Sequence, residues 1–165
     1  MKNVVKVLGL LLVMVSLVGC TAPKSKEDTI NELKQKNTTM FTAVNTYGGI
    51  IPDGDYLVST TYDIMYDGTV SIKYSYDLAG DTYVSTTIND EDYSEIYFRS
   101  VKAAKENDFE NYYIDGFDGG IWNITFYDPD NSTPTQLLAG SVAGGNETLD
   151  TYFSILKKLS AEAGN

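Results

Sequence analysis

The chain has 165 residues, enough for one domain of ordinary size, and its 42% hydrophobic and 21% charged residues predict a packed core rather than wholesale disorder. With no histidine and a single cysteine, it excludes a histidine-based catalytic triad, a cysteine–histidine dyad, a histidine-ligated metal site and a disulfide within the chain. The net charge of −11 is concentrated in residues 53–150, where 19 acidic side chains outnumber four basic ones, so binding to nucleic-acid phosphates is excluded.

Residues 1–19 have the layout of a secretory signal. Two lysines form a short basic region, an almost wholly apolar run follows from Val7 to Val18, and a small residue, Gly19, precedes Cys20. The apolar run is too short to span a bilayer comfortably as a helix. An ordinary cleaved signal, or a buried apolar helix with an incidental cysteine, would give a similar pattern.

The sequence Leu17-Val18-Gly19-Cys20 resembles the lipobox of bacterial lipoprotein precursors, and the resemblance covers only the first 20 residues. It implies that the Cys20 thiol receives a diacylglycerol and that signal peptidase II cuts between Gly19 and Cys20. Two acyl chains hold a protein stably at a membrane, whereas one holds it only marginally. The resemblance therefore implies a lipid anchor at the extracytoplasmic face of the cell membrane, with residues 20–27 as the lipidated tether.

Residues 28–165 are predicted to form a single α+β domain whose first part, residues 28–50, is less regular. Acidic residues in the first turn indicate a helix over residues 28–36. Over residues 37–47 helix and strand both stay open, because the apolar residues have helical spacing while the threonines disfavour a helix.

A β-hairpin is predicted around Asp67-Gly68, between strands at Tyr56–Tyr66 and Thr69–Asp77. A two-residue turn would set apolar residues opposite polar ones, so the register favours a three-residue loop with Gly68 in the left-handed conformation. That loop, Tyr66-Asp67-Gly68, pairs Ile64 with Val70, Tyr62 with Ile72, and Val58 with Tyr76. We expect Tyr62, Tyr74 and Tyr76 to pack beneath the helices.

The remaining elements alternate strands and helices. Strands are predicted at Thr82–Ile88, Ile121–Tyr127 and Thr135–Val142. One helix begins at Asn89 or Asp90, and its apolar stripe consists of Tyr93, Ile96, Tyr97, Val101 and Ala104. A second helix runs from Thr148 to Ala161, and its core side consists of Leu149, Tyr152, Phe153, Leu156 and Leu159. The sum is an α+β fold: a single antiparallel sheet of about five strands with two or three helices packed on it. This layout resembles small bacterial lipoproteins in general terms alone, which implies no activity.

Three patterns in the sequence are candidate sites. Oxygen atoms of Asp115, Asp118, Asp128, Asp130 and Asn131 would suit Ca²⁺, but the EF-hand pattern fails at Thr133 and Ala139, and turn residues explain the segment better. The glycine-rich run from Gly140 to Gly145 lacks the lysine of a phosphate-binding loop and indicates a strand end. Trp122 alternates in phase with Ile124 and Phe126, which indicates a core anchor rather than a sugar-stacking platform.

The sequence therefore predicts a membrane-anchored lipoprotein that acts as a non-enzymatic binding or interaction module at the cell envelope, with its ligand open. Cys20 is the one site residue, and we expect no catalytic, metal-binding or cofactor-binding residues and a monomeric state. The alternative is a hydrolase that acts on envelope glycan through a pair of carboxylates. With 23 acids, some pair meets any spacing by chance, so solvated surface charge is our interpretation of them. A partner is expected to be neutral or basic where it makes contact.

Overall fold

The computed structural model describes residues 24–47, 54–106, 113–114, 120–142 and 145–164. The chain divides into two units, with the boundary between Asn31 and Glu32, inside helix α2 (Lys26–Leu33). Ser25 caps α2: its Oγ accepts a hydrogen bond from the Asp28 N–H at 3.1 Å and donates one to the Asp28 carboxylate at 2.7 Å. The helix predicted over residues 28–36 therefore exists, but it begins and ends earlier. None of the described helices is long and apolar enough to cross a membrane.

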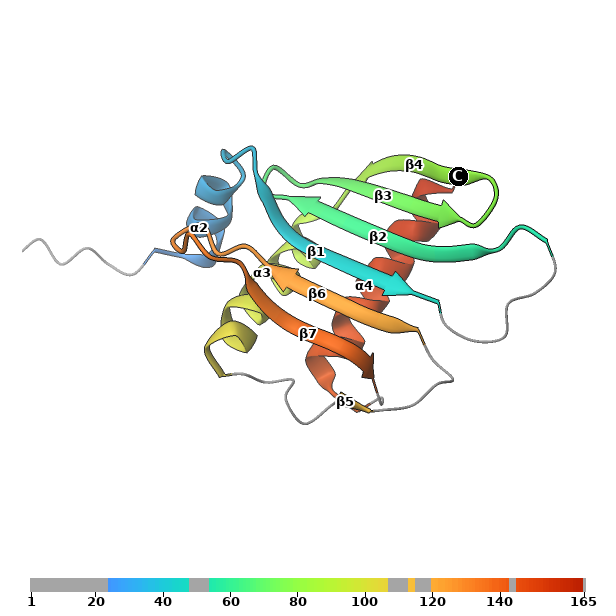
Figure 1. Cartoon of the computed structure of the whole chain (residues 1–165). Helices are drawn as coiled ribbons and strands as arrows, with labels where there is room; N and C mark the ends of the chain where they lie inside the picture. The colour runs from blue at the N-terminus through green and yellow to red at the C-terminus, as the bar shows by residue number, and fades with distance from the viewer. Residues whose placement is uncertain (1–23, 48–53, 107–112, 115–119, 143–144, 165) are drawn as a thin grey trace, which may run out of the picture. The chain divides into compact units, whose positions relative to one another are not determined.

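The second unit is built on one open antiparallel sheet of six strands (Figure 1). In spatial order these are β4 (Gly80–Thr87), β3 (Thr69–Tyr76), β2 (Leu57–Met65), β1 (Thr39–Thr46), β6 (Ile121–Phe126) and β7 (Thr135–Val142). A two-residue strand, β5 (Tyr113–Ile114), pairs with the end of β7. The sequence predicted about five strands, and the additional one is β1, where helix and strand had stayed open. Its threonines, branched at Cβ, favour the pleated backbone of a strand.

The predicted hairpin between β2 and β3 is confirmed in all but one detail. Gly68 has φ +89° and its N–H donates to the Met65 carbonyl at 3.1 Å, which closes the three-residue loop. Ile64 lies opposite Val70 and Tyr62 opposite Ile72, as the register required. The pairing of Val58 with Tyr76 is wrong, because the register of β2 shifts between Leu57 and Ser59 and sets Leu57 opposite Tyr76.

Helices α3 (Asp90–Glu106) and α4 (Glu147–Ala163) both lie behind the sheet in Figure 1 and cover the same face. The ring of Phe41 on β1 meets that of Tyr152 on α4 at 5.1 Å between centroids, edge to face. Aromatic pairs of this geometry add to the stabilisation that comes from buried area. Asn146 caps α4 by accepting a hydrogen bond from the Leu149 N–H at 3.0 Å.

The helix stripes follow the predictions with small shifts. On α3 the buried residues are Tyr93, Ile96, Tyr97, Ser100 and Ala103. On α4 they are Thr148, Leu149, Tyr152, Ile155, Leu156 and Leu159. Val101 and Ala104 on α3, and Phe153 on α4, are only half-buried, which corrects their assignment to the core. Phe153 lies at the side of its stripe, where its ring packs on the half-buried Trp122 at 4.7 Å.

The core lies between the sheet and these two helices. In β1 the register shifts at Met40 and Phe41, and both side chains are fully buried. Asn45 lies farther along the same strand, and among the described residues its Oδ1 is the one buried side-chain nitrogen or oxygen without a hydrogen-bond partner. A Cβ on Gly120 would come within 2.1 Å of this oxygen, so the close approach of the two segments requires glycine there.

Candidate binding surface

The side of the sheet that faces away from α3 and α4 carries a broad surface, here called the open face. Its members follow from the pairing register, because residues opposite each other on neighbouring strands share a face. One row crosses the sheet through Tyr83, Lys73, Thr61, Val44, Asn123 and Ala139. The flanking rows are Asp81, Ser75, Ser59, Thr46 and Ile121 on one side, and Ser85, Ser71, Asp63, Thr42, Thr125 and Gln136 on the other. Thr69 and Thr87, opposite each other on β3 and β4, lie on the same face.

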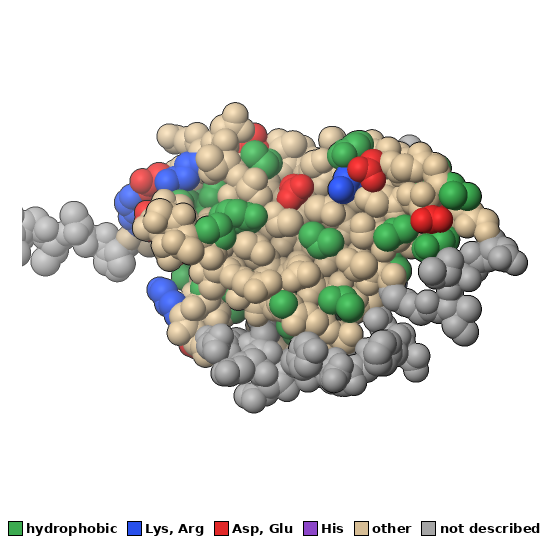
Figure 2. All heavy atoms as spheres, in the orientation of Figure 1, with side chains coloured by type: hydrophobic (Ala, Val, Ile, Leu, Met, Phe, Trp, Pro, Cys, Tyr) green, Lys and Arg blue, Asp and Glu red, His purple; other side chains and the backbone are tan. Residues whose placement is uncertain are grey.

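The open face is polar and rich in hydroxyl groups. Ten of these 19 positions are serine or threonine, and three, Asp63, Lys73 and Asp81, carry charges, a fraction similar to that of the whole chain. Figure 2 shows this side of the sheet in the orientation of Figure 1: tan and green atoms cover the strands, with only isolated red and blue ones among them. Two of the 23 acidic side chains of the chain, Asp63 and Asp81, are among these positions.

Each charge on the open face has a partner within the protein. The Asp63 carboxylate accepts a hydrogen bond from the Thr42 hydroxyl at 2.7 Å. Lys73 Nζ lies 3.7 Å from the Asp81 carboxylate. A hydrogen bond from Ser75 and the nearby Lys73 ammonium hold the pKa of the Asp81 carboxyl below its usual value. Lys73 and Asp81 can consequently lose water to a ligand as an ion pair, and the Asp63 carboxylate keeps its hydrogen bond from the Thr42 hydroxyl.

A groove of about 570 Å³ between α3 and α4 collects many of the acids. Five carboxylates line it, those of Glu91, Asp92, Glu95, Glu147 and Asp150. Two ion pairs join the helices: Arg99 on α3 donates to Glu147 at 3.0 Å, and Lys158 on α4 lies 2.6 Å from Asp92. Arg99 also donates to Glu95 on its own helix at 2.6 Å. These hydrogen bonds raise the pKa of Arg99 and of Lys158. The groove thus contains ion pairs between helices, whereas a glycosidase needs one carboxyl in an apolar pocket.

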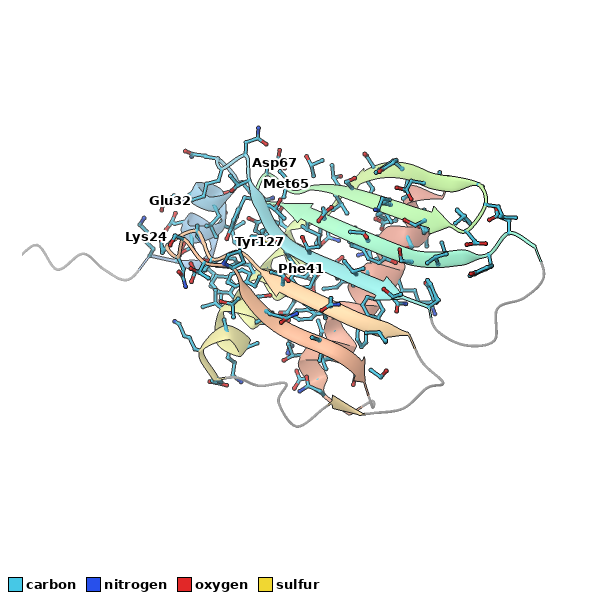
Figure 3. The ribbon with its side chains drawn as sticks, viewed as in Figure 1. Lys24, Glu32, Phe41, Met65, Asp67 and Tyr127 are labelled. Carbon is cyan, nitrogen blue, oxygen red and sulfur yellow. The ribbon has the colours of Figure 1, made fainter. Side chains whose placement is uncertain are left out.

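A second hollow, of about 540 Å³, lies where β1 begins and β2 and β6 end. Met65 and Tyr127 are among its lining residues (Figure 3), together with Asn37, Thr38, Thr39, Tyr66, Asp128 and Pro129. The Tyr66 hydroxyl donates to the Tyr127 carbonyl at 2.6 Å. This bond joins the loop after β2 to the end of β6, so the floor of the hollow belongs to the structural framework of the sheet.

The residues singled out from sequence are distributed as follows. Gly19, Cys20, Asp115 and Asp118 lie outside the described residues. Asp128 and Asn131 serve as turn residues: their side chains accept hydrogen bonds from the backbone N–H groups of Asp130 and Thr133, at 3.0 and 3.1 Å. Within the described ranges no group of three or more acidic or cysteine side chains is placed to hold a metal ion.

The aromatic candidate residues and Ser141 of the glycine-rich run lie within the strands. Trp122 lies on the covered side of β6 beside Phe153, and Ser141 lies within β7. Tyr62 is buried and its hydroxyl shares a 2.7 Å hydrogen bond with Ser160 on α4, as expected of a tyrosine beneath a helix. Tyr74 and Tyr76 are only half-buried, which corrects the expectation that they pack fully under the helices.

Sequence reasoning did not identify the open face as a surface. The signal was present in the alternating polar positions of β2, where Ser59, Thr61 and Asp63 share one side. Joining such sides across six strands requires the strand order. In comparisons with known proteins, no family and no curated protein matches this chain, so its function has to be argued from the surfaces described above.

Proposed function

We propose that the protein is a lipid-anchored, non-enzymatic binding module of the cell envelope that holds its ligand on the open face. The observation that carries the proposal is the contrast within one sheet: α3 and α4 both pack on one side, and neither packs on the other. The surface is also rich in hydroxyl groups, because ten of the 19 positions named above are serine or threonine.

The chemistry of the open face supports binding of a neutral polar surface. Its hydroxyl groups can both donate and accept hydrogen bonds, and its amides, such as Asn123 and Gln136, do the same. Strands about 4.8 Å apart present these groups at regular spacing on a rigid support. Val44 and Ile121 add apolar contact area between the polar groups. No general acid, nucleophile or metal is needed for this role.

The glycan-hydrolase alternative receives no support from the described residues. The carboxylates that lie close together are those of the α3–α4 groove, and Arg99 and Lys158 hold three of them in ion pairs. Glu147 has a side chain that is 86% exposed, far from the apolar setting in which a proton donor works. We therefore propose binding rather than hydrolysis.

The anchor is tested at Cys20. Cys20→Ser removes the thiol that receives the lipid, so the protein should remain as an uncleaved precursor or be cut by another route. The measurement is the intact mass of the chain, together with its partition into a detergent phase. A diacyl mass on the mature Cys20→Ser chain would contradict the lipobox assignment.

The binding role is tested by photo-crosslinking in intact cells. A benzophenone amino acid replaces Thr46, which is exposed on the open face, and in a matched variant it replaces Lys157, which is exposed on α4. Irradiation should give a discrete adduct from the Thr46 position alone. Equal adducts from both positions, or adducts from Lys157 only, would contradict binding by the open face.

A further inference from the structure

We propose that the outer edge of β4 accepts an extended segment of another protein, neutral or basic in charge, which adds a seventh long strand to the sheet. This inference concerns the strand edge and the backbone. It depends neither on the lipid anchor nor on the ligand of the open face.

The edge of β4 lacks the usual protection against strand addition. β4 is the outermost strand, and its eight residues pair with β3 without a register shift. It contains no proline, and its single charge, Asp81, is paired with Lys73. Native proteins normally block such an edge with prolines, bulges or unpaired charges. At the other side of the sheet, β5 pairs with the end of β7, and the β6–β7 pairing is interrupted by a register shift.

The free backbone groups of this edge can be assigned to particular residues. The Ile88 N–H donates to the Gly68 carbonyl at 3.0 Å, so Ile88 turns its backbone toward β3. Because neighbouring residues of a strand point their backbone groups in opposite directions, the odd-numbered residues of β4 point theirs outward. Asp81, Tyr83, Ser85 and Thr87 therefore present a ladder of N–H and carbonyl groups to a further strand.

Side chains beside the edge offer apolar contact to such a segment. Tyr83 is 64% exposed on the open face, and Leu78, in the turn before β4, is 74% exposed. An exposed aromatic ring next to free backbone groups covers the side chains of an added strand.

The charge of the protein favours a neutral or basic segment at the β4 edge. Asp81 and Lys73 neutralise each other at the edge, while the remainder of the chain is strongly acidic. Two copies of the chain, each with a net charge of −11, repel each other, whereas a neutral or basic segment is not repelled. The preferred occupant is therefore a strand of a different protein that lacks acidic side chains.

The test uses the full-length protein in detergent and a fluorescent synthetic peptide. The peptide has the sequence of β3, which already pairs with the inner edge of β4, with one lysine added at each end. In a control peptide every lysine is replaced by glutamate. A third peptide has the sequence of the first, but its backbone nitrogens are methylated at alternate residues, which removes the N–H groups of one edge. Binding is followed by fluorescence anisotropy at low and high salt.

Two protein variants separate the edge from other surfaces. Ser85→Pro removes an outward N–H and no bond to β3, and an edge strand tolerates proline at such a position. Ser85→Ala removes the hydroxyl and keeps the N–H. We expect Ser85→Pro to weaken binding of the basic peptide about tenfold or more, since a ladder hydrogen bond is lost and the ring obstructs the approach. Ser85→Ala should change it less than about twofold.

Binding of the three peptides should depend on the same backbone hydrogen bonds and on charge. The methylated peptide should fail to bind, and the acidic peptide should bind more weakly than the basic one, with a difference that shrinks as salt rises. Binding that is unaffected by both Ser85→Pro and backbone methylation would overturn the proposal, as would no binding of the basic peptide at about 1 mM. Concentration-dependent dimers that Ser85→Pro dissolves would assign the edge to a second copy and equally overturn it. None of these results would alter the crosslinking test of the open face.

Discussion

The two faces of the sheet share the same strands and differ in almost everything else. Phe41 on the covered face is fully buried against Tyr152, whereas its neighbour Thr42 on the open face forms a hydrogen bond with Asp63 (Figure 3 labels Phe41). Successive side chains of a strand point to opposite sides, so one backbone supplies both surfaces. The comparison shows that folding requires only the covered face. The covered face holds the apolar area that drives folding, and the open face is free to meet another molecule.

The largest difference between the faces should appear in the free energy of unfolding. Leu156 on α4 is 2% exposed, so Leu156→Ala leaves a cavity and should lower that free energy by about 2–5 kcal/mol. Ser71→Ala on the open face should change it by less than about 0.5 kcal/mol. Urea unfolding of the two full-length variants in detergent checks both values. Equal effects would mean that α4 does not pack on the sheet as described.

A smaller effect is expected from the tyrosines of the covered side. The Tyr93 hydroxyl donates to the Tyr66 carbonyl at 2.9 Å, so Tyr93→Phe should cost about 0.5–1.5 kcal/mol at neutral pH. Burial raises the pKa of the phenols of Tyr66 and Tyr93 above the usual value, with the neighbouring Tyr97 adding to both shifts. The fold favours the neutral phenols, so this stabilisation is complete below pH about 10 and is lost as the pH rises above it.

An alkaline absorbance titration measures the ionisation of the buried tyrosines directly. The full tyrosinate signal of the 13 tyrosines should develop only when the protein unfolds. Tyr93→Phe should remove one of the tyrosines that ionise only on unfolding. Ionisation of all the tyrosines near pH 10 with the fold intact would contradict the burial of Tyr66 and Tyr93.

How far the sequence predicted this fold depends on whether the deciding contacts are local. The hairpin register around Gly68 was predictable because a short loop and the apolar alternation of two adjacent strands determine it. The strand β1 was not, because Met40, Val44 and Tyr47 have helical spacing and only pairing with β2 and the distant β6 decides the conformation. The misplaced pairing of Val58 has a similar origin, since a bulge leaves no signal in the alternation.

The candidate surface was predictable strand by strand and not as a whole. The polar alternation of Ser59, Thr61 and Asp63 marked an uncovered side of β2. The chain passes through α3 before β6 returns to lie beside β1, and this return brings Asn123 into the same surface. No local sequence pattern reveals that connection. The free edge of β4 likewise depends on the strand order.

The most direct test of the account compares the two sides of the molecule in the living cell. Asn123→Cys, exposed on the open face, and Lys157→Cys, exposed on α4, are each labelled with a membrane-impermeant maleimide, both in intact cells and after purification in detergent. With the proposed lipid on Cys20, the introduced thiol is the reactive one. We predict that the Asn123→Cys thiol reacts several-fold more slowly in cells than after purification, because a ligand covers the open face, while the Lys157→Cys thiol reacts equally in both. Equal reaction of the Asn123→Cys thiol in cells and in detergent would contradict the central claim.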